Sequence, residues 1–415
     1  MMHTEIEKVI DSHKKHVNSG MARLMNMLNV GVESVAEGAY IFDHDNNRYL
    51  DCGGYCVFLL GQRHPRLLSA ITSQLENIAL SSRLLVNQQV AKAADALVSI
   101  TPEKLQYVWF ANSGAEAVEA AIKLCKINGK SRFIAMQGGF HGKTTGALSL
   151  THNTKYRDPF MPLMPGVTFA SFGDIESLRK LLLNSEGEAA VILEPIQSEA
   201  GVIIPSEGYL KTVEGLCRDH NALLVIDEIS TGLGRTGEWW YCQSENVTPD
   251  ILLCGKALSG GLVPVSALVC TPELYQQFNT NPLLHTSTFS GSPLVSSVVY
   301  ETINLLKDLD APARSREIGS SIVNGINSVI ARGNYPFIRE IRARGLLIAL
   351  EFHDEASAGE FLLSMLQNQV IVSHSLNAHV TVRLTPSLCL SENDISYLID
   401  AVETSLTDIK NRYYQ

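Results

Sequence analysis

Two ionisable side chains and one turn stand where short apolar runs end. Lys256 comes just after the run ILLC, Asp227 follows ALLVI, and Ser113, Gly114 and Ala115 follow YVWFAN at the start of a helical segment. A lysine buried at an apolar strand end loses its proton by desolvation, and the neutral amine is a nucleophile. The free backbone N–H groups at a helix start bind anions such as phosphate. These residues can supply a nucleophilic amine, a buried carboxylate and a phosphate-binding turn.

Pyridoxal phosphate (PLP) requires these three groups. Lys256 suits the covalent bond to the cofactor aldehyde, and Asp227 suits a charge-assisted hydrogen bond to the pyridine nitrogen. The turn at Ser113, Gly114 and Ala115 suits the phosphate, because the helix dipole lies behind it. Each feature alone has an ordinary explanation, as a solvated loop lysine or a helix cap. The interpretation therefore depends on the three occurring together.

The elements that position these groups predict an α/β fold. The runs FIAMQ, AAVILEP, ALLVIDE and ILLCGK are short and apolar, as strands of a mostly parallel sheet covered by helices are. Ligands bind at the carboxyl ends of such strands. The segment 40–51 reads as a β-hairpin. From about residue 310, longer polar helical stretches with the runs GLLIALEF and VTVRLTP indicate a smaller α+β domain.

The composition narrows the class of protein. The 415 residues are 45% hydrophobic and carry a net charge of −10, the wrong sign for a protein that mainly binds nucleic acid or an anionic membrane. We found no signal peptide and no apolar run of membrane-spanning length, and the eight cysteines are mostly isolated. We therefore expect a cytoplasmic protein with reduced thiols. Cys52 and Cys56 lack a second ligand pair, so we expect no metal site.

Nearly the whole chain resembles the class III aminotransferases, which are PLP enzymes of fold type I, with ornithine and putrescine aminotransferases most similar. The matching blocks follow the order of the family: YLDCGGYCVFLLGQRHP, ANSGAEAVEAAIKLCK, GGFHGKTTGALSLT, LEPIQSEAGV, LLVIDEISTGLGRTG, DILLCGKALSGGLVPVSALV, HTSTFSGSP and VRLTP. The resemblance implies a large PLP-binding domain at 51–308 and a C-terminal small domain at 309–415. The N-terminal segment 1–50 is expected to contribute to the small domain.

The resemblance also implies roles for individual residues around the cofactor. Lys256 matches the lysine that bonds to the cofactor, and Asp227 matches the partner of the pyridine nitrogen. Phe140 matches the aromatic residue that stacks on the ring. The other residues expected to bind the cofactor are Ser113, Gly114, Ala115, His141, Ser230, Ser287 and Thr288. The particular role of His141 stays open. The pair Ser287 and Thr288 is similar to hydroxyls that reach the phosphate from a neighbouring subunit, which implies a homodimer with shared active sites.

Five further residues are expected to contact substrates: Tyr55, Lys143, Glu194, Glu199 and Arg383. In the family, a glutamate and an arginine at the last two positions act as a switch. The arginine binds a substrate carboxylate, and the glutamate neutralises it while the other substrate is bound. For Glu194, a purely structural role is an equal alternative.

Two departures from the family pattern give conflicting indications of the substrate. Lys143 replaces an arginine, which weakens bidentate binding of a distal carboxylate and is the state of putrescine-type enzymes. Tyr55 matches a tyrosine of ornithine aminotransferases, whereas Val86 replaces another aromatic residue of those enzymes. Ser230 replaces a glutamine that touches the cofactor, and Ser290 and Ser292 replace a glycine and an asparagine near the phosphate.

These observations predict an aminotransferase that moves the terminal amino group of an ω-amine to a 2-oxo acid, 2-oxoglutarate above all. The donor would be a diamine or an ornithine- or lysine-like compound. An epimerase or aminomutase on the same fold is an alternative, because fold does not settle the reaction. A PLP-binding interaction protein without turnover is a more remote one.

Overall fold

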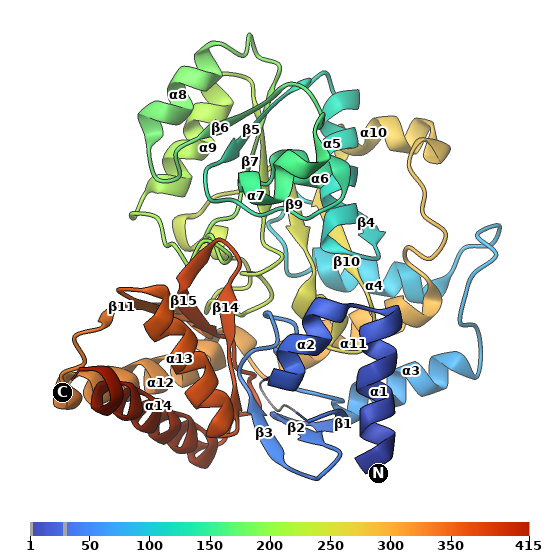
Figure 1. Cartoon of the computed structure of the whole chain (residues 1–415). Coiled ribbons are helices and arrows are strands. Elements are labelled where there is room, and N and C mark those ends of the chain that lie inside the picture. The colour runs from blue at the N-terminus through green and yellow to red at the C-terminus, as the bar shows by residue number, and fades with distance from the viewer. Residues whose placement is uncertain (1–2, 28–30, 415) are drawn as a thin grey trace.

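The computed structural model describes residues 3–27 and 31–414, so residues 1–2, 28–30 and 415 of the predicted terminal segments lie outside this description. Figure 1 shows helices packed around a central sheet, with further strands toward both ends of the chain. None of the helices in the described ranges is long and apolar enough to cross a membrane. The eight cysteines are free, and all are buried except Cys389.

The central sheet has seven strands in the order β4-β10-β9-β8-β7-β5-β6. Their bounds are β4 Tyr107–Ala111, β5 Arg132–Met136, β6 Val167–Ala170, β7 Ala189–Leu193, β8 Leu223–Asp227, β9 Ile251–Cys254 and β10 Ser266–Cys270. All neighbours are parallel except β10, which is antiparallel to both β4 and β9. Strands β7, β9 and β10 are buried at every residue, which explains why their sequences are apolar except for Ser266 at the start of β10. The predicted α/β fold is confirmed.

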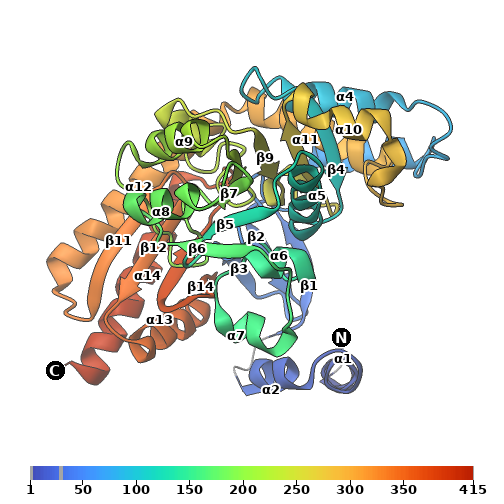
Figure 2. The ribbon, with the colours of Figure 1, turned by 90° about the horizontal axis from the view of Figure 1, so that it is seen from above.

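Helices cover both faces of this sheet. Along β7, Ile192 enters the core formed with α5 (Gly114–Ile127), whereas Val191 and Leu193 enter the core formed with α9 (Tyr209–Asp219) and α11 (Pro293–Asp308). Figure 2 shows α5 and α9 on opposite sides of β7. Alternate side chains of one strand thus fill two different cores, and the whole strand is dry.

The remaining helices have the following bounds. They are α1 His3–His16, α2 Ser19–Met27, α3 Pro65–Leu75, α4 Gln88–Val98, α6 Thr145–Leu150, α7 Thr154–Arg157, α8 Ile175–Leu183, α10 Pro272–Thr280, α12 Ala311–Gly333, α13 Glu355–Gln367 and α14 Glu392–Tyr413. Short 3-10 helices are η1 Asp158–Phe160, η2 Tyr241–Glu245, η3 Lys256–Ser259 and η4 Pro282–Leu284.

Two four-stranded sheets lie outside the central one. The first, β1-β2-β3-β13, contains the predicted hairpin as the antiparallel strands β2 (Tyr40–Asp43) and β3 (Arg48–Asp51), with β1 at Glu33–Glu37. Its fourth strand, β13 (Val370–Ile371), pairs in parallel with β3 although it comes from the C-terminal region. The second sheet, β11-β12-β15-β14, is antiparallel and comprises β11 Ile338–Arg344, β12 Leu347–Phe352, β14 Ser373–Ser375 and β15 Ala378–Leu384.

The C-terminal sheet contains both predicted runs, GLLIALEF as β12 and VTVRLTP as β15. The N-terminal sheet is completed by chain from the far end of the sequence. The division into 1–50, 51–308 and 309–415 stays a prediction, and its second boundary falls where α11 ends at Asp308.

The register of the central sheet brings Asp227 and Lys256 to the same edge of the sheet. Asp227 is the last residue of β8 and pairs with Leu253 of the parallel strand β9. Lys256 lies two residues beyond the end of β9 and begins η3 with a left-handed φ of 45°. A residue other than glycine in this conformation is strained, and such strain is concentrated at functional sites.

Candidate active site

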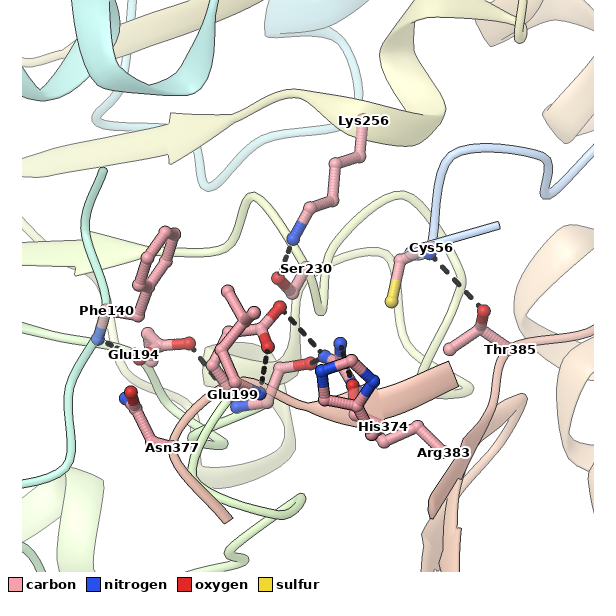
Figure 3. A network of polar contacts seen from close by, with 12 residues as sticks. Cys56, Phe140, Glu194, Glu199, Ser230, Lys256, His374, Asn377, Arg383 and Thr385 are labelled. Carbon is pink, nitrogen blue, oxygen red and sulfur yellow. Dashed lines mark hydrogen bonds and ion pairs between the residues drawn. The ribbon is translucent and has the colours of Figure 1, made fainter. Parts of the chain in front are cut away.

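Lys256 points its amine toward the residues that follow β8. Its Nζ donates a hydrogen bond to Ser230 Oγ, three residues after Asp227 (Figure 3). The side chain of Lys256 is partly buried, and Ser230 is 9% exposed. Ser230, which departs from the family pattern, therefore contacts the lysine directly in this structure.

Asp227 is paired with His141, the residue whose role the sequence leaves open. The carboxylate is 4% exposed, and its Oδ2 accepts from His141 Nδ1 at 2.7 Å. Its Oδ1 accepts from the backbone N–H of Ile229 at 3.2 Å. Burial alone would lower the pKa of His141, but the hydrogen bond and the charge of Asp227 outweigh it and raise that pKa. His141 thus holds the buried carboxylate in one orientation.

The predicted phosphate turn begins α5. Ser113 is the N-cap, and its Oγ accepts from the backbone N–H of Glu116 at 3.2 Å. Gly114 packs so closely that a Cβ atom there would lie 2.9 Å from Ile229 Cδ1. Ala115 lies against Gly142, where an added Cβ would be 2.8 Å from the Ala115 Cβ. The turn is therefore fixed from two sides, and the first N–H groups of the helix have no partner within the helix.

Ser287 lies beside this turn within the same chain, because its Oγ accepts from Asn112 Nδ2 at 3.0 Å. The carbonyl oxygens of Thr288 and Ser290 both accept from Arg83 Nη2 at 2.8 Å. The loop 287–290 is thereby joined to the loop that precedes α4. The other departure in this block, Ser292, is the N-cap of α11, where its Oγ accepts from the N–H of Val295.

Phe140 and Glu194 come from adjacent strand ends and are connected directly. Glu194 Oε1 accepts from the backbone N–H of Phe140 at 2.9 Å, and Oε2 accepts from that of Ser198 at 3.3 Å. Burial, together with the charge of Asp227, raises the pKa of Glu194 to about 7 although the charge of His141 opposes this. Both Asp227 and Lys256 act electrostatically on Glu194, so the three ionisable groups share one site.

Glu199 and Arg383 form a buried ion pair, with Oε1 and Nη1 3.0 Å apart. Arg383 lies on β15 and is 0% exposed, and Glu199 is 4% exposed. Nη1 also donates to Ser198 Oγ at 2.8 Å. Figure 3 shows this pair below Lys256 in the view. The structure thus brings the two halves of the predicted switch together.

Two predicted substrate residues are exposed to solvent. Tyr55 is 52% exposed and has a left-handed φ of 51°. Its neighbour Cys56 donates its N–H to Thr385 Oγ1 at 3.4 Å, two residues after Arg383. Lys143 is also exposed, and its Nζ lies 4.4 Å from the ring centroid of Tyr156.

Some residues of the site were missed by the sequence analysis. Ser198 lies inside a recognised block, but only the fold shows that its hydroxyl meets Arg383. Asn377 lies outside every block, yet its N–H donates to the carbonyl of Glu199 at 2.9 Å and its Nδ2 donates to that of Gly138 at 3.1 Å. Neither contact leaves a signal in spacing, because each joins segments far apart in the chain.

The residues fit PLP on observations of this structure. A buried carboxylate, a lysine at the neighbouring strand end and a glycine-tight helix start meet at one edge of the sheet. Lys256 would hold the aldehyde, Asp227 the pyridine nitrogen and the turn at Ser113 the phosphate. Across the described ranges, no group of three or more His, Cys, Asp or Glu side chains is placed to hold a metal ion.

The chain is similar to known proteins over nearly its whole length. The family model described as aminotransferase class-III matches residues 23–406. The ornithine aminotransferase of Toxoplasma gondii ME49 is 29% identical, with a TM-score of 0.87 over 98% of this chain and 99% of that one. Another structure of the Toxoplasma gondii enzyme, 28% identical with a TM-score of 0.88 over 99% of both chains, is described with PLP at partial occupancy in its active site.

The acetylornithine aminotransferase of Elizabethkingia anophelis is 30% identical, with a TM-score of 0.81 over 94% of this chain and 99% of that one. The family model covers most of the chain, and the identity to a solved member reaches 30%, so membership of the family is established. The residues at the sheet edge fit the cofactor. The chain therefore belongs to the class III aminotransferase family and is a PLP-dependent transaminase of fold type I.

Proposed function

We propose that the enzyme takes the terminal amino group of an ω-amine and transfers it to a 2-oxo acid, with 2-oxoglutarate as the acceptor. The donor is a diamine or an ornithine- or lysine-like compound. The observation that carries this proposal is the buried ion pair between Glu199 and Arg383. A guanidinium binds a substrate carboxylate, and the adjacent glutamate neutralises it when a substrate without that carboxylate is bound.

The residues of the chain would divide the work between them. When bound, PLP withdraws electrons from the substrate carbon and stores the amino group between the two half-reactions. Lys256 would take the proton from the substrate carbon and deliver it to the cofactor carbon, and Ser230 accepts a hydrogen bond from its Nζ. Asp227, oriented by His141, keeps the pyridine nitrogen protonated. Phe140 closes one face of the ring against water.

The preference for a terminal amine has support from two sides. Structures similar to this chain include enzymes described as ornithine and acetylornithine aminotransferases. Tyr55 and Lys143 stand at exposed positions, where they can contact the distal part of a long substrate. Lys143 presents one cation rather than a planar fork, so it favours a distal group that does not need two parallel hydrogen bonds.

The proposal is tested by measuring the two half-reactions separately by stopped-flow absorbance. Putrescine, ornithine and lysine serve as donors, and 2-oxoglutarate and pyruvate serve as acceptors. We expect Glu199→Gln to raise the donor KM about tenfold, because the charge of Arg383 is then not neutralised, and to leave the 2-oxoglutarate KM unchanged. Lys256→Ala is the control without turnover.

Two outcomes would overturn the proposal. If Glu199→Gln left both half-reactions as they were, the ion pair would be only structural. If product formed at full rate without any 2-oxo acid, the enzyme would be an isomerase, because an isomerase needs no second substrate.

We further propose that the enzyme is a homodimer in which loop 287–290 reaches the partner's phosphate site through Thr288. The loops joined by Arg83 expose large apolar side chains, among them Leu84 at 91%, Val86 at 100% and Phe289 at 58%. A surface of this kind is typical of a protein interface. A second copy would remove these side chains from water.

A further inference from the structure

Ser198 is fixed in place through both its backbone and its side chain. Its backbone N–H donates to Glu194 Oε2 at 3.3 Å, and its Oγ accepts from Arg383 Nη1 at 2.8 Å. The residue is 0% exposed, as is Arg383. The hydroxyl therefore lies in a dry environment, where a hydrogen bond to a charged donor is worth more than one in water.

The same nitrogen of Arg383 faces two acceptors. Nη1 carries two hydrogens, and the structure gives it a hydrogen bond to Ser198 Oγ and an ion pair with Glu199 Oε1. The rest of the guanidinium is held less firmly, because Nη2 reaches the carbonyl of His374 only at 3.4 Å and Nε has no partner. The hydrogen bond to Ser198 is thus the shortest one that the Arg383 guanidinium makes to an uncharged group.

Glu199 has anchors of its own that do not involve the arginine. Its Oε2 accepts from the N–H of Leu376 at 3.1 Å, and its carbonyl accepts from the N–H of Asn377 at 2.9 Å. The backbone contact with Asn377 keeps the residue attached to the turn between β14 and β15 when its carboxylate leaves Nη1. The contact between Ser198 and Arg383 does not depend on that movement.

We propose that Ser198 is a positioning residue that holds the Arg383 guanidinium in its carboxylate-binding pose while Glu199 is turned away. The inference rests on the proposed function, in which Arg383 binds the carboxylate of the 2-oxo acid. One N–H of Nη1 keeps its hydrogen bond to Ser198 Oγ. The other N–H exchanges Glu199 for the carboxylate of the incoming acid as its acceptor. A long arginine side chain that is held in advance loses less entropy when the acid binds.

The test compares Ser198→Ala with the unchanged holoenzyme in each half-reaction. We expect the KM for 2-oxoglutarate to rise about tenfold, in line with the loss of one hydrogen bond to a charged group, and the amine half-reaction to change less than about twofold. Ser198→Gly, which also lacks the hydroxyl, should give the same split, so the result does not depend on one variant folding well. A change below about twofold in the 2-oxoglutarate KM, or an equal loss in both half-reactions, would overturn the proposal.

A matched control comes from the same region. Ser375 on β14 is also 0% exposed, but its Oγ has no hydrogen-bond partner. Ser375→Ala should leave both half-reactions unchanged, which separates loss of this contact from loss of any buried hydroxyl.

Arg383→Gln separates the two levels of inference. If it raises the 2-oxoglutarate KM while Ser198→Ala does not, only the role of Ser198 is wrong. If Arg383→Gln leaves that KM unchanged, the proposed function itself fails.

Discussion

Three buried carboxylates in the site have different neighbours. Asp227 has an imidazole at 2.7 Å, in His141, and Glu199 has a guanidinium at 3.0 Å, in Arg383. Glu194 accepts only two backbone N–H groups, and burial raises its pKa to about 7. The three carboxylates therefore have different partners, namely an imidazole, a guanidinium and backbone N–H groups.

The raised pKa of Glu194 predicts a pH-dependent contribution to stability. The carboxyl binds its proton more tightly in the folded state than in the unfolded one, where its pKa has the ordinary value of 4.5. Its contribution is fully present below pH 4.5 and is lost as the pH rises through about 7. Glu194→Gln cannot ionise, so its free energy of unfolding should exceed that of the parent increasingly between pH 5 and 8, by up to about 3 kcal/mol.

Urea unfolding at a series of pH values measures this difference. The charge of Glu194 contributes to raising the pKa of His141, so the difference between the two curves reports the titration of both groups. Parallel curves across this pH range would mean that Glu194 is already ionised in the folded protein at low pH.

The segment between β5 and α6 connects Phe140, the residue expected to stack on the cofactor, to the predicted phosphate turn. It carries Phe140, His141 and Lys143, and it touches the turn through Gly142. Gly142 has a φ of 123°, which L residues rarely adopt. A Cβ atom there would come within 2.8 Å of the Ala115 Cβ. The absence of a side chain thus lets the segment that carries Phe140 pack against the start of α5, and both are expected to bind the cofactor.

Gly142→Ala should therefore weaken PLP binding as well as folding. We expect a loss of about 1–3 kcal/mol in stability and a clear rise in the Kd for PLP, because the turn at Ala115 must shift. Gly129→Ala is the matched control, since Gly129 also has a positive φ, of 80°, but an added Cβ would meet no atom within 4 Å. Unfolding by urea measures the stability of each variant. Equal PLP affinity in the two variants would contradict the prediction, because it would mean that the contact between Gly142 and Ala115 has no effect on PLP binding.

The strands that carry Lys256 and Asp227 were predictable because they are short, apolar and followed by polar residues. The direction of β10 was not, since an antiparallel strand buried on both faces has the same composition as a parallel one. Strand β6 was missed because only one of its four residues is fully buried. Sequence therefore predicts which residues end at the sheet edge, while tertiary pairing decides how neighbouring strands run.

At the scale of the whole molecule, buried side chains join regions that are distant in the sequence. Arg235 is 1% exposed, and its guanidinium donates to the carbonyls of Pro386 at 2.5 Å, Leu346 at 3.3 Å and Cys56 at 3.4 Å. It thereby ties the loop containing Tyr55 to the C-terminal region. Such contacts, like that between Ser198 and Arg383, arise only when the chain is folded, which is why the motifs predict Glu199 and Arg383 as a pair but not the residues that contact them.

In the proposed homodimer, the exposed loop before α4 lies in the interface. A single charge introduced into this loop should therefore weaken the dimer. Burying a leucine contributes about 2 kcal/mol, and burying an unpaired aspartate costs more, so Leu84→Asp should raise the dimer Kd at least about tenfold. Sedimentation velocity measures this shift, and activity should fall with the dimer fraction if Thr288 completes the partner's site. Leu183→Asp is the control, because Leu183 is 63% exposed at the end of α8, away from these loops. A Leu84→Asp protein that stays dimeric, or a fully active monomer, would contradict the shared active site.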